Sequence, residues 1–248
     1  MSLLSVRDLT VTRGACPVVD RVSFAVQPSE IVGLIGPNGA GKTTLMRGAL
    51  GLLPASGDSS LGRLTARDRA RAVAWMPQSR EIAWPVTVET LVTLGRIPHL
   101  PASPRDRAAV DAALARLDLL PFRERKATEL SGGEQARVLL ARVLAQETPL
   151  ILADEPIAGL DPAHQIATME VFRGLAREGR AVVVALHDLG LAARYCTRLL
   201  LMDRGRLVAD GTPRDVLTEA NLRAHFHVRA RFEETADGPV FQLLERVA

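Results

Sequence analysis

A glycine-rich segment at residues 36–43 has the residue types and spacing of a phosphate-binding loop, G-x-x-x-x-G-K-[ST]. A nucleoside triphosphate is a dense anion, and successive backbone N–H groups can wrap it only where no side chain blocks their approach. Glycines permit this approach, Lys42 supplies a positive charge for the outer phosphates, and Thr43 offers a hydroxyl to Mg²⁺. The predicted binding residues are Gly36, Pro37, Asn38, Gly39, Ala40, Gly41, Lys42, Thr43 and Thr44.

Two adjacent acids follow an apolar segment further along the chain. Residues 150–153 are typical of a buried strand, and Asp154 and Glu155 come directly after it. Charges seldom follow such a strand without a partner, because burying an unpaired carboxylate is costly. Asp154 is predicted to hold Mg²⁺, directly or through water, beside the Thr43 hydroxyl. Glu155 points in a different direction and can orient or deprotonate a water molecule.

The elements that must position these groups alternate between strands and helices. The patterns predict strands at 3–11, 18–26, 30–35, 72–76, 150–153, 181–186, 199–202 and 206–209, with Gly14 and Pro17 in the first connection. They predict helices at 43–50, from Asp161-Pro162 to about Glu178, and at 189–195. Such alternation favours a mostly parallel sheet.

Between residues 88 and 145 the pattern becomes helical. Ser103-Pro104 opens one helix with a cap residue and then proline at the first position. Another helix follows Ser131-Gly132-Gly133, and a serine and two glycines before a helix also make a second anion site. We interpret this stretch as a helical sub-domain inserted into an α/β core. Residues 228–246 are predicted to form a terminal hairpin with Asp237-Gly238 as the turn.

The composition is that of a folded protein of 248 residues. Hydrophobic residues make up 47% and charged residues 24%, which excludes a disordered chain, a collagen and a coiled-coil rod. The net charge is only +3, and no block of Lys or Arg demands nucleic acid, so we expect no nucleic-acid partner. Two cysteines are too few for a disulfide scaffold and fit a reducing cytosol. No signal peptide is evident, and no apolar stretch approaches the roughly 18–20 residues that cross a bilayer.

The order of these motifs resembles that of the ATP-binding cassette (ABC) ATPases. The decisive segment looks like that family's signature sequence and stands between the phosphate loop and the acid-ended strand; it comprises Leu130, Ser131, Gly132, Gly133, Glu134 and Gln135. Gln78 resembles the Q-loop glutamine, Asp161 lies in a segment similar to the D-loop, and His187 resembles the switch histidine. The resemblance covers nearly the whole chain.

The resemblance implies a homodimer in which two chains close head to tail over two ATPs. Each ATP then lies between the phosphate loop of one copy and residues 130–135 of the other. Glu155 polarises the attacking water, Gln78 contacts Mg²⁺ and this water, and His187 contacts the γ-phosphate. The expected cofactors are therefore ATP and Mg²⁺; the expected catalytic residues are Glu155, His187 and Gln78, and the expected metal ligands are Thr43, Gln78 and Asp154.

One departure from the family concerns the base. The family often has an aromatic residue stacking on adenine just after the first strand, and Arg13 occupies that place here. A guanidinium plane can stack on a base, so Arg13 is the expected ATP-binding residue at this point.

Two segments indicate a group within the family. Residues 85–99, which include Gly95-Arg96-Ile97-Pro98-His99, and residues 211–226 look like those of the ATPase subunits of importers for ferric siderophores, haem and cobalamin. This resemblance implies a separate integral-membrane permease dimer and, indirectly, a periplasmic or extracellular substrate-binding protein. The subunit would be peripheral, on the cytoplasmic face of the inner (plasma) membrane.

Several alternatives stay open. The chain could serve a zinc or manganese importer, or be a soluble ABC ATPase not tied to transport. Two further classes are disfavoured. A small P-loop kinase would not need residues 130–135, and a non-catalytic regulator would not need an intact Lys42, Asp154, Glu155 and His187.

The expected fold class is α/β, with a P-loop NTPase (RecA-like) core, an N-terminal antiparallel β part and an inserted α-helical sub-domain. Residues 1–248 are expected to form a single ABC ATPase domain. Within it, we expect the nucleotide-binding core at 1–78 and 148–227, the helical sub-domain at 79–147, and a hairpin or tail at 228–248.

Overall fold

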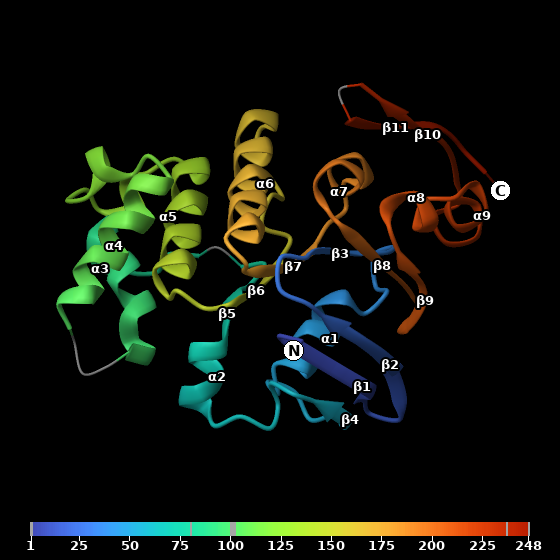
Figure 1. The fold of residues 1–248 in the computed structure, drawn as a ribbon, viewed down its shortest axis with the longest axis horizontal. Coiled ribbons are helices and arrows are strands. Elements are labelled where there is room, and N and C mark those ends of the chain that lie inside the picture. The colour runs from blue at the N-terminus through green and yellow to red at the C-terminus, as the bar shows by residue number, and fades with distance from the viewer. Residues whose placement is uncertain (1, 80, 100–102, 237, 248) are drawn as a thin grey trace.

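The computed structural model describes residues 2–79, 81–99, 103–236 and 238–247, and its centre is a six-stranded sheet (Figure 1). The strand order is β5-β6-β7-β3-β8-β9, with β9 antiparallel to β8 and the other neighbours parallel. The strands are β3 (Ile31–Ile35), β5 (Val73–Met76), β6 (Leu150–Asp154), β7 (Ala181–Ala185), β8 (Arg198–Asp203) and β9 (Arg206–Gly211). The predicted mostly parallel sheet is confirmed.

Alternate side chains of the central strands join two apolar clusters, one on each face of the sheet. On β7, Val182 and Val184 belong to one cluster, whereas Ala181, Val183 and Ala185 belong to the other. Successive side chains of a strand point to opposite faces, so a strand buried on both faces is apolar at every position. This explains why the strand segments in the sequence are continuous apolar runs.

Helices and a second sheet cover these two faces (Figure 1). Residues of α6 (Pro162–Arg177) and α7 (Leu189–Tyr195) pack in the first cluster, and residues of α1 (Lys42–Ala49) pack in the second. An antiparallel sheet in the order β2-β1-β4 completes the second cluster; its strands are β1 (Leu4–Arg13), β2 (Cys16–Val26) and β4 (Ser56–Ser59). The predicted antiparallel N-terminal part is therefore present.

A group of helices lies beside the β5 end of the sheet, drawn in green in Figure 1. We call it the helical part, and it comprises α3 (Val88–Thr93), the 3₁₀ helix η1 (Leu94–His99), α4 (Pro104–Arg116) and α5 (Gly132–Ala145), with the short 3₁₀ turns η2 (Leu120–Phe122) and η3 (Ala127–Glu129). Helix α4 begins after Ser103, as predicted, and the Ser103 N–H donates to the Asp106 carboxylate at 2.7 Å.

The C-terminal residues form two short helices, a π-helical turn and a hairpin, in the order α8 (Pro213–Val216), α9 (Glu219–Asn221), η4 (Leu222–Phe226), β10 (Val228–Thr235) and β11 (Gly238–Arg246). Strand β11 packs against α7 (Figure 1). Of the predicted turn, Asp237 lies outside the described residues.

Two local predictions differ from the structure. Pro17 lies inside β2, opposite Thr12, rather than in the connection. An edge strand tolerates proline, because proline lacks only the N–H that a further neighbour would need. The sequence patterns also missed β4 and the exposed helix α2 (Ala66–Ala72), which has no buried residue and therefore no apolar face to detect.

The apolar content is distributed over short elements. Among the described residues, no helix combines the length and hydrophobicity needed to cross a membrane.

Substitution of the buried Phe172 tests the packing of α6 against the sheet. Its side chain is fully buried, so Phe172→Ala should lower the free energy of unfolding by about 3–5 kcal/mol in urea denaturation. Ile166 lies on the same helix and is 44% exposed, so Ile166→Ala should cost less than about 1 kcal/mol. Equal losses for the two variants would contradict this packing.

Candidate nucleotide site

The glycine-rich loop leaves the central strand β3 and enters α1, at the carboxyl edge of the parallel sheet where α/β proteins bind ligands. Gly36 has φ of +146°, and a Cβ built on it would lie 2.1 Å from the Met202 carbonyl oxygen. Gly41 has φ of +97°, and its Cβ would lie 2.7 Å from the Val18 carbonyl oxygen. Both glycines are therefore required by backbone conformation and by close approach.

Lys42 is held inside this loop. Its side chain is buried, and Nζ donates to the carbonyl oxygens of Gly36 at 2.8 Å and Pro37 at 3.1 Å. Burial lowers the pKa of Lys42, while the nearby Glu155 and Asp154 carboxylates act in the opposite direction. The ammonium group is thus already placed at the loop, where the outer phosphates of a nucleotide would lie.

Asp154 ends β6 as a buried carboxylate beside the Thr43 hydroxyl. Its side chain is 1% exposed, and neither oxygen has a hydrogen-bond partner of good geometry within the described residues. Burial raises its pKa most, and Glu155 adds to the rise, whereas the Thr43 hydroxyl, Lys42 and His187 lower it. A buried, unsatisfied carboxylate beside a threonine hydroxyl is an oxygen donor set that fits a Mg²⁺ ion.

Glu155 accepts hydrogen bonds from the other two predicted catalytic side chains. Gln78 Nε2 donates to Glu155 Oε2 at 2.9 Å, and His187 Nε2 donates to Glu155 Oε1 at 2.6 Å. Glu155 itself has φ of +50°, a left-handed conformation that non-glycine residues rarely adopt and that clusters at functional sites. The structure thus brings three side chains from separate segments together at one carboxylate.

Lys42, Glu155 and His187 line one cavity of about 190 Å³, whereas Gly36, Pro37, Gln78 and Asp154 are not among its lining residues. Its lining contains residues 38–44, Glu155, His187 and Val18. Val18 was not predicted, since only the packing of β2 against the loop places it there and nothing in its local sequence signals a role. Arg13 is exposed at the end of β1 and lines a neighbouring cavity of about 270 Å³, which shares Val18, Thr43 and Thr44 with the first.

The segment Leu130 to Gln135 lies apart from this cavity and none of its residues lines it. Ser131 caps α5: its hydroxyl accepts from the Glu134 N–H at 3.4 Å, and the Ser131 N–H donates to the Glu134 carboxylate at 2.8 Å. Ser131 and Gly132 are exposed. Asp161 caps α6 in the same manner by accepting from the His164 N–H at 3.0 Å. One chain therefore does not bring these residues to its own phosphate loop.

Comparison with known proteins identifies relatives of the chain. Residues 19–158 match the ABC transporter family. The hemin import ATP-binding protein HmuV of Pseudomonas entomophila is 44% identical over 237 residues, which cover 91% of this chain and 93% of that protein. The cobalamin import ATP-binding protein BtuD of Halobacterium salinarum is 44% identical over 235 residues, which cover 91% of this chain but only 59% of that longer protein.

The fold has counterparts among solved structures. An inward-facing structure of an ABC transporter described as metal-chelate type superimposes with a TM-score of 0.85 at 26% identity, covering 98% of this chain and 97% of that one. An ATP-binding subunit of an ABC transporter gives 0.79 at 28% identity, with 90% and 95% covered. The expected fold class is confirmed.

The isolated Asp154 carboxylate makes a prediction about stability. An ionised carboxylate that is buried without hydrogen bonds destabilises the folded state, so Asp154→Asn should raise the free energy of unfolding of the ligand-free protein at pH 7. Urea denaturation in EDTA measures this. The same variant should lose most of the stabilisation that native protein gains from ATP and Mg²⁺. A less stable ligand-free variant would contradict the inference that burial of the Asp154 carboxylate costs more than its neighbours return.

Proposed function

The chain belongs to the ABC transporter family, and from this membership we propose that it is the ATP-hydrolysing subunit of an importer for an iron complex or cobalamin. The observation that carries the proposal is the Glu155 carboxylate, held between Gln78 and His187 at the cavity that also contains Lys42. A site that only bound nucleotide would not need a carboxylate in this setting.

Glu155 is the proposed residue that polarises the attacking water. A carboxylate that already accepts from Gln78 and His187 is fixed in orientation, so it can accept a proton from water without first reorganising. His187 Nε2 carries the proton in this arrangement, and this N–H would have to turn from Glu155 to reach the γ-phosphate of a bound ATP. Catalysis of phosphoryl transfer consists mostly of such positioning and charge stabilisation.

Mg²⁺ is the proposed metal, and Thr43, Asp154 and Gln78 are its proposed ligands. Support comes from the buried oxygens of Asp154, which have no hydrogen-bond partner of good geometry and lie beside the Thr43 hydroxyl. When bound, the ion would neutralise charge on the β- and γ-phosphates. The described residues include no cluster of three or more His, Cys, Asp or Glu side chains, which fits an ion that shares its coordination with the nucleotide.

A homodimer is the proposed active form. Residues 130–135 present an exposed helix N-terminus with two glycines, which is a good anion site, yet they lie away from the cavity of their own chain. A second copy facing head to tail would supply this segment, with Asp161 nearby, to the ATP of the first. Arg13, beside Thr43 and Thr44, is the proposed stacking partner of the adenine.

The proposed cargo follows the relatives. The two relatives described above are named for import of hemin and cobalamin. A ferric siderophore is included because the sequence resembles ATPase subunits of importers for ferric siderophores, haem and cobalamin. The subunit would dock on a separate permease dimer at the cytoplasmic face of the membrane, with a substrate-binding protein as an indirect partner. A zinc or manganese importer is the second candidate.

Replacing the proposed catalytic carboxylate should separate binding from turnover. Glu155→Gln should bind ATP and form an ATP-dependent dimer in size-exclusion chromatography, while hydrolysis falls ~10²–10³-fold in a phosphate-release assay. Glu170→Gln, which changes an exposed acid on α6, is the matched control and should keep native turnover.

Lys42→Ala should lose ATP binding, because the loop then lacks its ammonium group. Normal hydrolysis by Lys42→Ala would refute the phosphate-loop assignment.

Uptake of labelled haem, cobalamin and a ferric siderophore by cells tests the cargo. Replacement of the native protein by Glu155→Gln should abolish uptake of one of these three, and Glu170→Gln should preserve it. If uptake of all three is unchanged while Zn²⁺ or Mn²⁺ uptake falls, the metal-ion importer takes the place of the proposed function.

A further inference from the structure

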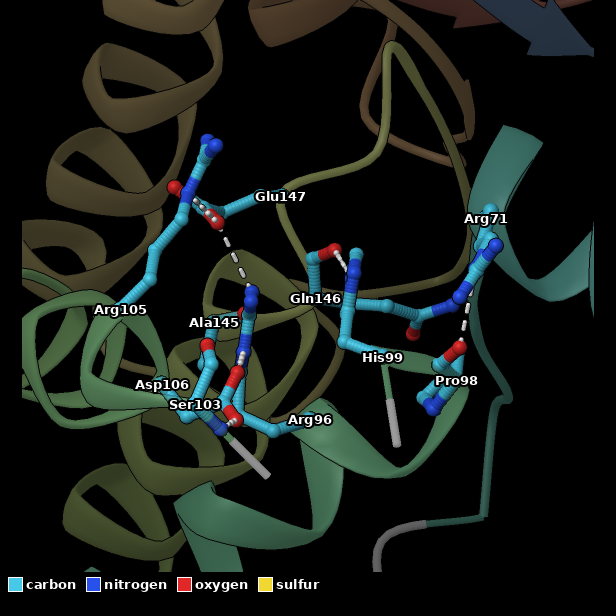
Figure 2. Close-up of polar contacts among 10 residues, drawn as sticks. All are labelled: Arg71, Arg96, Pro98, His99, Ser103, Arg105, Asp106, Ala145, Gln146 and Glu147. Carbon is cyan, nitrogen blue, oxygen red and sulfur yellow. Dashed lines mark hydrogen bonds and ion pairs between the residues drawn. The ribbon is translucent and has the colours of Figure 1, made fainter. Parts of the chain in front are cut away.

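The segment Gly95 to His99 was singled out by the sequence patterns but has no part in the nucleotide site. It makes up most of η1, and it lies against the C-terminal end of α5 (Figure 2). A Cβ on Gly95 would lie 2.2 Å from the Arg142 carbonyl oxygen, so only glycine allows η1 to approach the last turn of α5 this closely. Helix α5 is the one whose N-terminus carries Ser131.

Arg96 is a buried cation at this end of the helix. Its side chain is 5% exposed, and Nη1 donates to the Ala145 carbonyl oxygen at 2.6 Å (Figure 2). The last carbonyls of a helix have no partner within it and carry partial negative charge, so a guanidinium at this place both satisfies and stabilises them. Two carboxylates balance the charge: Asp106 accepts from Nε at 2.8 Å and Glu147 accepts from Nη1 at 2.9 Å.

His99 completes the cap from the same 3₁₀ helix. Its Nε2 lies 2.9 Å from the Gln146 carbonyl oxygen, and since a carbonyl only accepts, Nε2 carries the proton. Arg96 and His99 thus hold two successive carbonyls at the end of α5. Asp106 also accepts from the Ser103 N–H, so the start of α4 joins the same cluster.

Hydrogen bonds also connect this cluster to α2 and β5. Gln146 Nε2 donates to the carbonyl oxygens of Ala70 at 2.5 Å and Val73 at 3.2 Å. Arg71 Nε donates to the carbonyl oxygen of Pro98 at 3.0 Å (Figure 2). These acceptors and donors belong to α2, the start of β5 and η1. The end of α5 is therefore fixed both to the helical part and to the strand that leads to Gln78.

From these contacts we propose that Arg96 is a positioning residue for ATP hydrolysis: by fixing the C-terminal end of α5, it sets where Ser131 is presented to the ATP of a second copy. The 14 residues of α5 make a rod of about 21 Å, so a small tilt at the capped end displaces the other end. The inference rests on the proposed dimer of the preceding subsection. Lysine cannot replace Arg96, because one ammonium lacks the planar fork that reaches acceptors on α4, on α5 and in the loop after α5.

The test measures two affinities in the Glu155→Gln background, where ATP is bound but hydrolysed slowly. The first is binding of a fluorescent ATP analogue to dilute, monomeric protein, which does not involve Ser131 of a second copy. The second is dimerisation in ATP and Mg²⁺ by analytical ultracentrifugation, which uses Ser131 as well. Arg96→Lys and Arg96→Ala should leave the first within about twofold and weaken the second roughly tenfold or more. Arg105→Ala is the control, since Arg105 is 76% exposed and contacts only Glu147 of this cluster, at 3.4 Å.

The outcomes separate this inference from the proposed function. Dimerisation of the Arg96 variants within twofold of the background overturns the positioning role, and so does a parallel loss of nucleotide binding and dimerisation, which marks a general loss of structure. If circular dichroism shows that Arg96→Ala does not fold, nucleotide binding and dimerisation are compared in Arg96→Lys and His99→Gln instead. If Glu155→Gln with a native Arg96 does not dimerise in ATP, the proposed function fails instead.

Discussion

The burial of the Asp154 carboxylate is the constraint on which the nucleotide site depends. Folding places it at the edge of the central sheet, beside the Thr43 hydroxyl and next to a second carboxylate, Glu155, with no hydrogen bond of good geometry to either oxygen. Buried Lys42 is close enough to act on both. Burial raises the pKa of Asp154 and lowers that of Lys42, so the ligand-free site disfavours both charges. Nucleotide and cation together would relieve what folding alone leaves unsatisfied, which links binding to stability.

The surrounding elements hold these charges in place at some cost to local backbone freedom. Glu155 adopts a left-handed conformation, and the loop glycines accept contacts that any side chain would block. Strands buried on both faces make this edge of the sheet rigid, so strain can be retained there. The helical part presents the exposed N-terminus of α5, and the Arg96 cluster fixes the opposite end of that helix to α2 and β5. The phosphate loop and the Ser131 helix end that we propose for a partner's ATP thus lie on different but connected parts of the molecule.

Much of the site could be predicted because its signals are local. The strand, glycine loop and helix around Lys42 are contiguous, and so are the apolar strand and the acids that end it. The Ser131 cap of α5 is equally local, with its partner only three residues away. Family resemblance then nominated Gln78 and His187, and the structure places both against Glu155.

The rest depends on contacts between distant residues, which a single sequence does not reveal. Val18 reaches the cavity only because β2 packs against the loop. Strand β4 has the weak strand sequence Ser56 to Ser59, and pairing with β1 decides its conformation. Arg96 meets Ala145 across 49 residues of chain, so its burial as a helix cap had no local signature.

The most direct test of the account is whether one ATP needs two chains, and mixing two defective variants measures this. Lys42→Ala lacks the phosphate-loop charge, and Ser131→Arg blocks the helix end that a partner's ATP would meet. Carried in the Glu155→Gln background, neither should associate alone in ATP and Mg²⁺, whereas the mixture should form a heterodimer around one intact site, seen by analytical ultracentrifugation. A mixture that stays monomeric, or a Ser131→Arg variant that dimerises as well as its parent, would contradict the account.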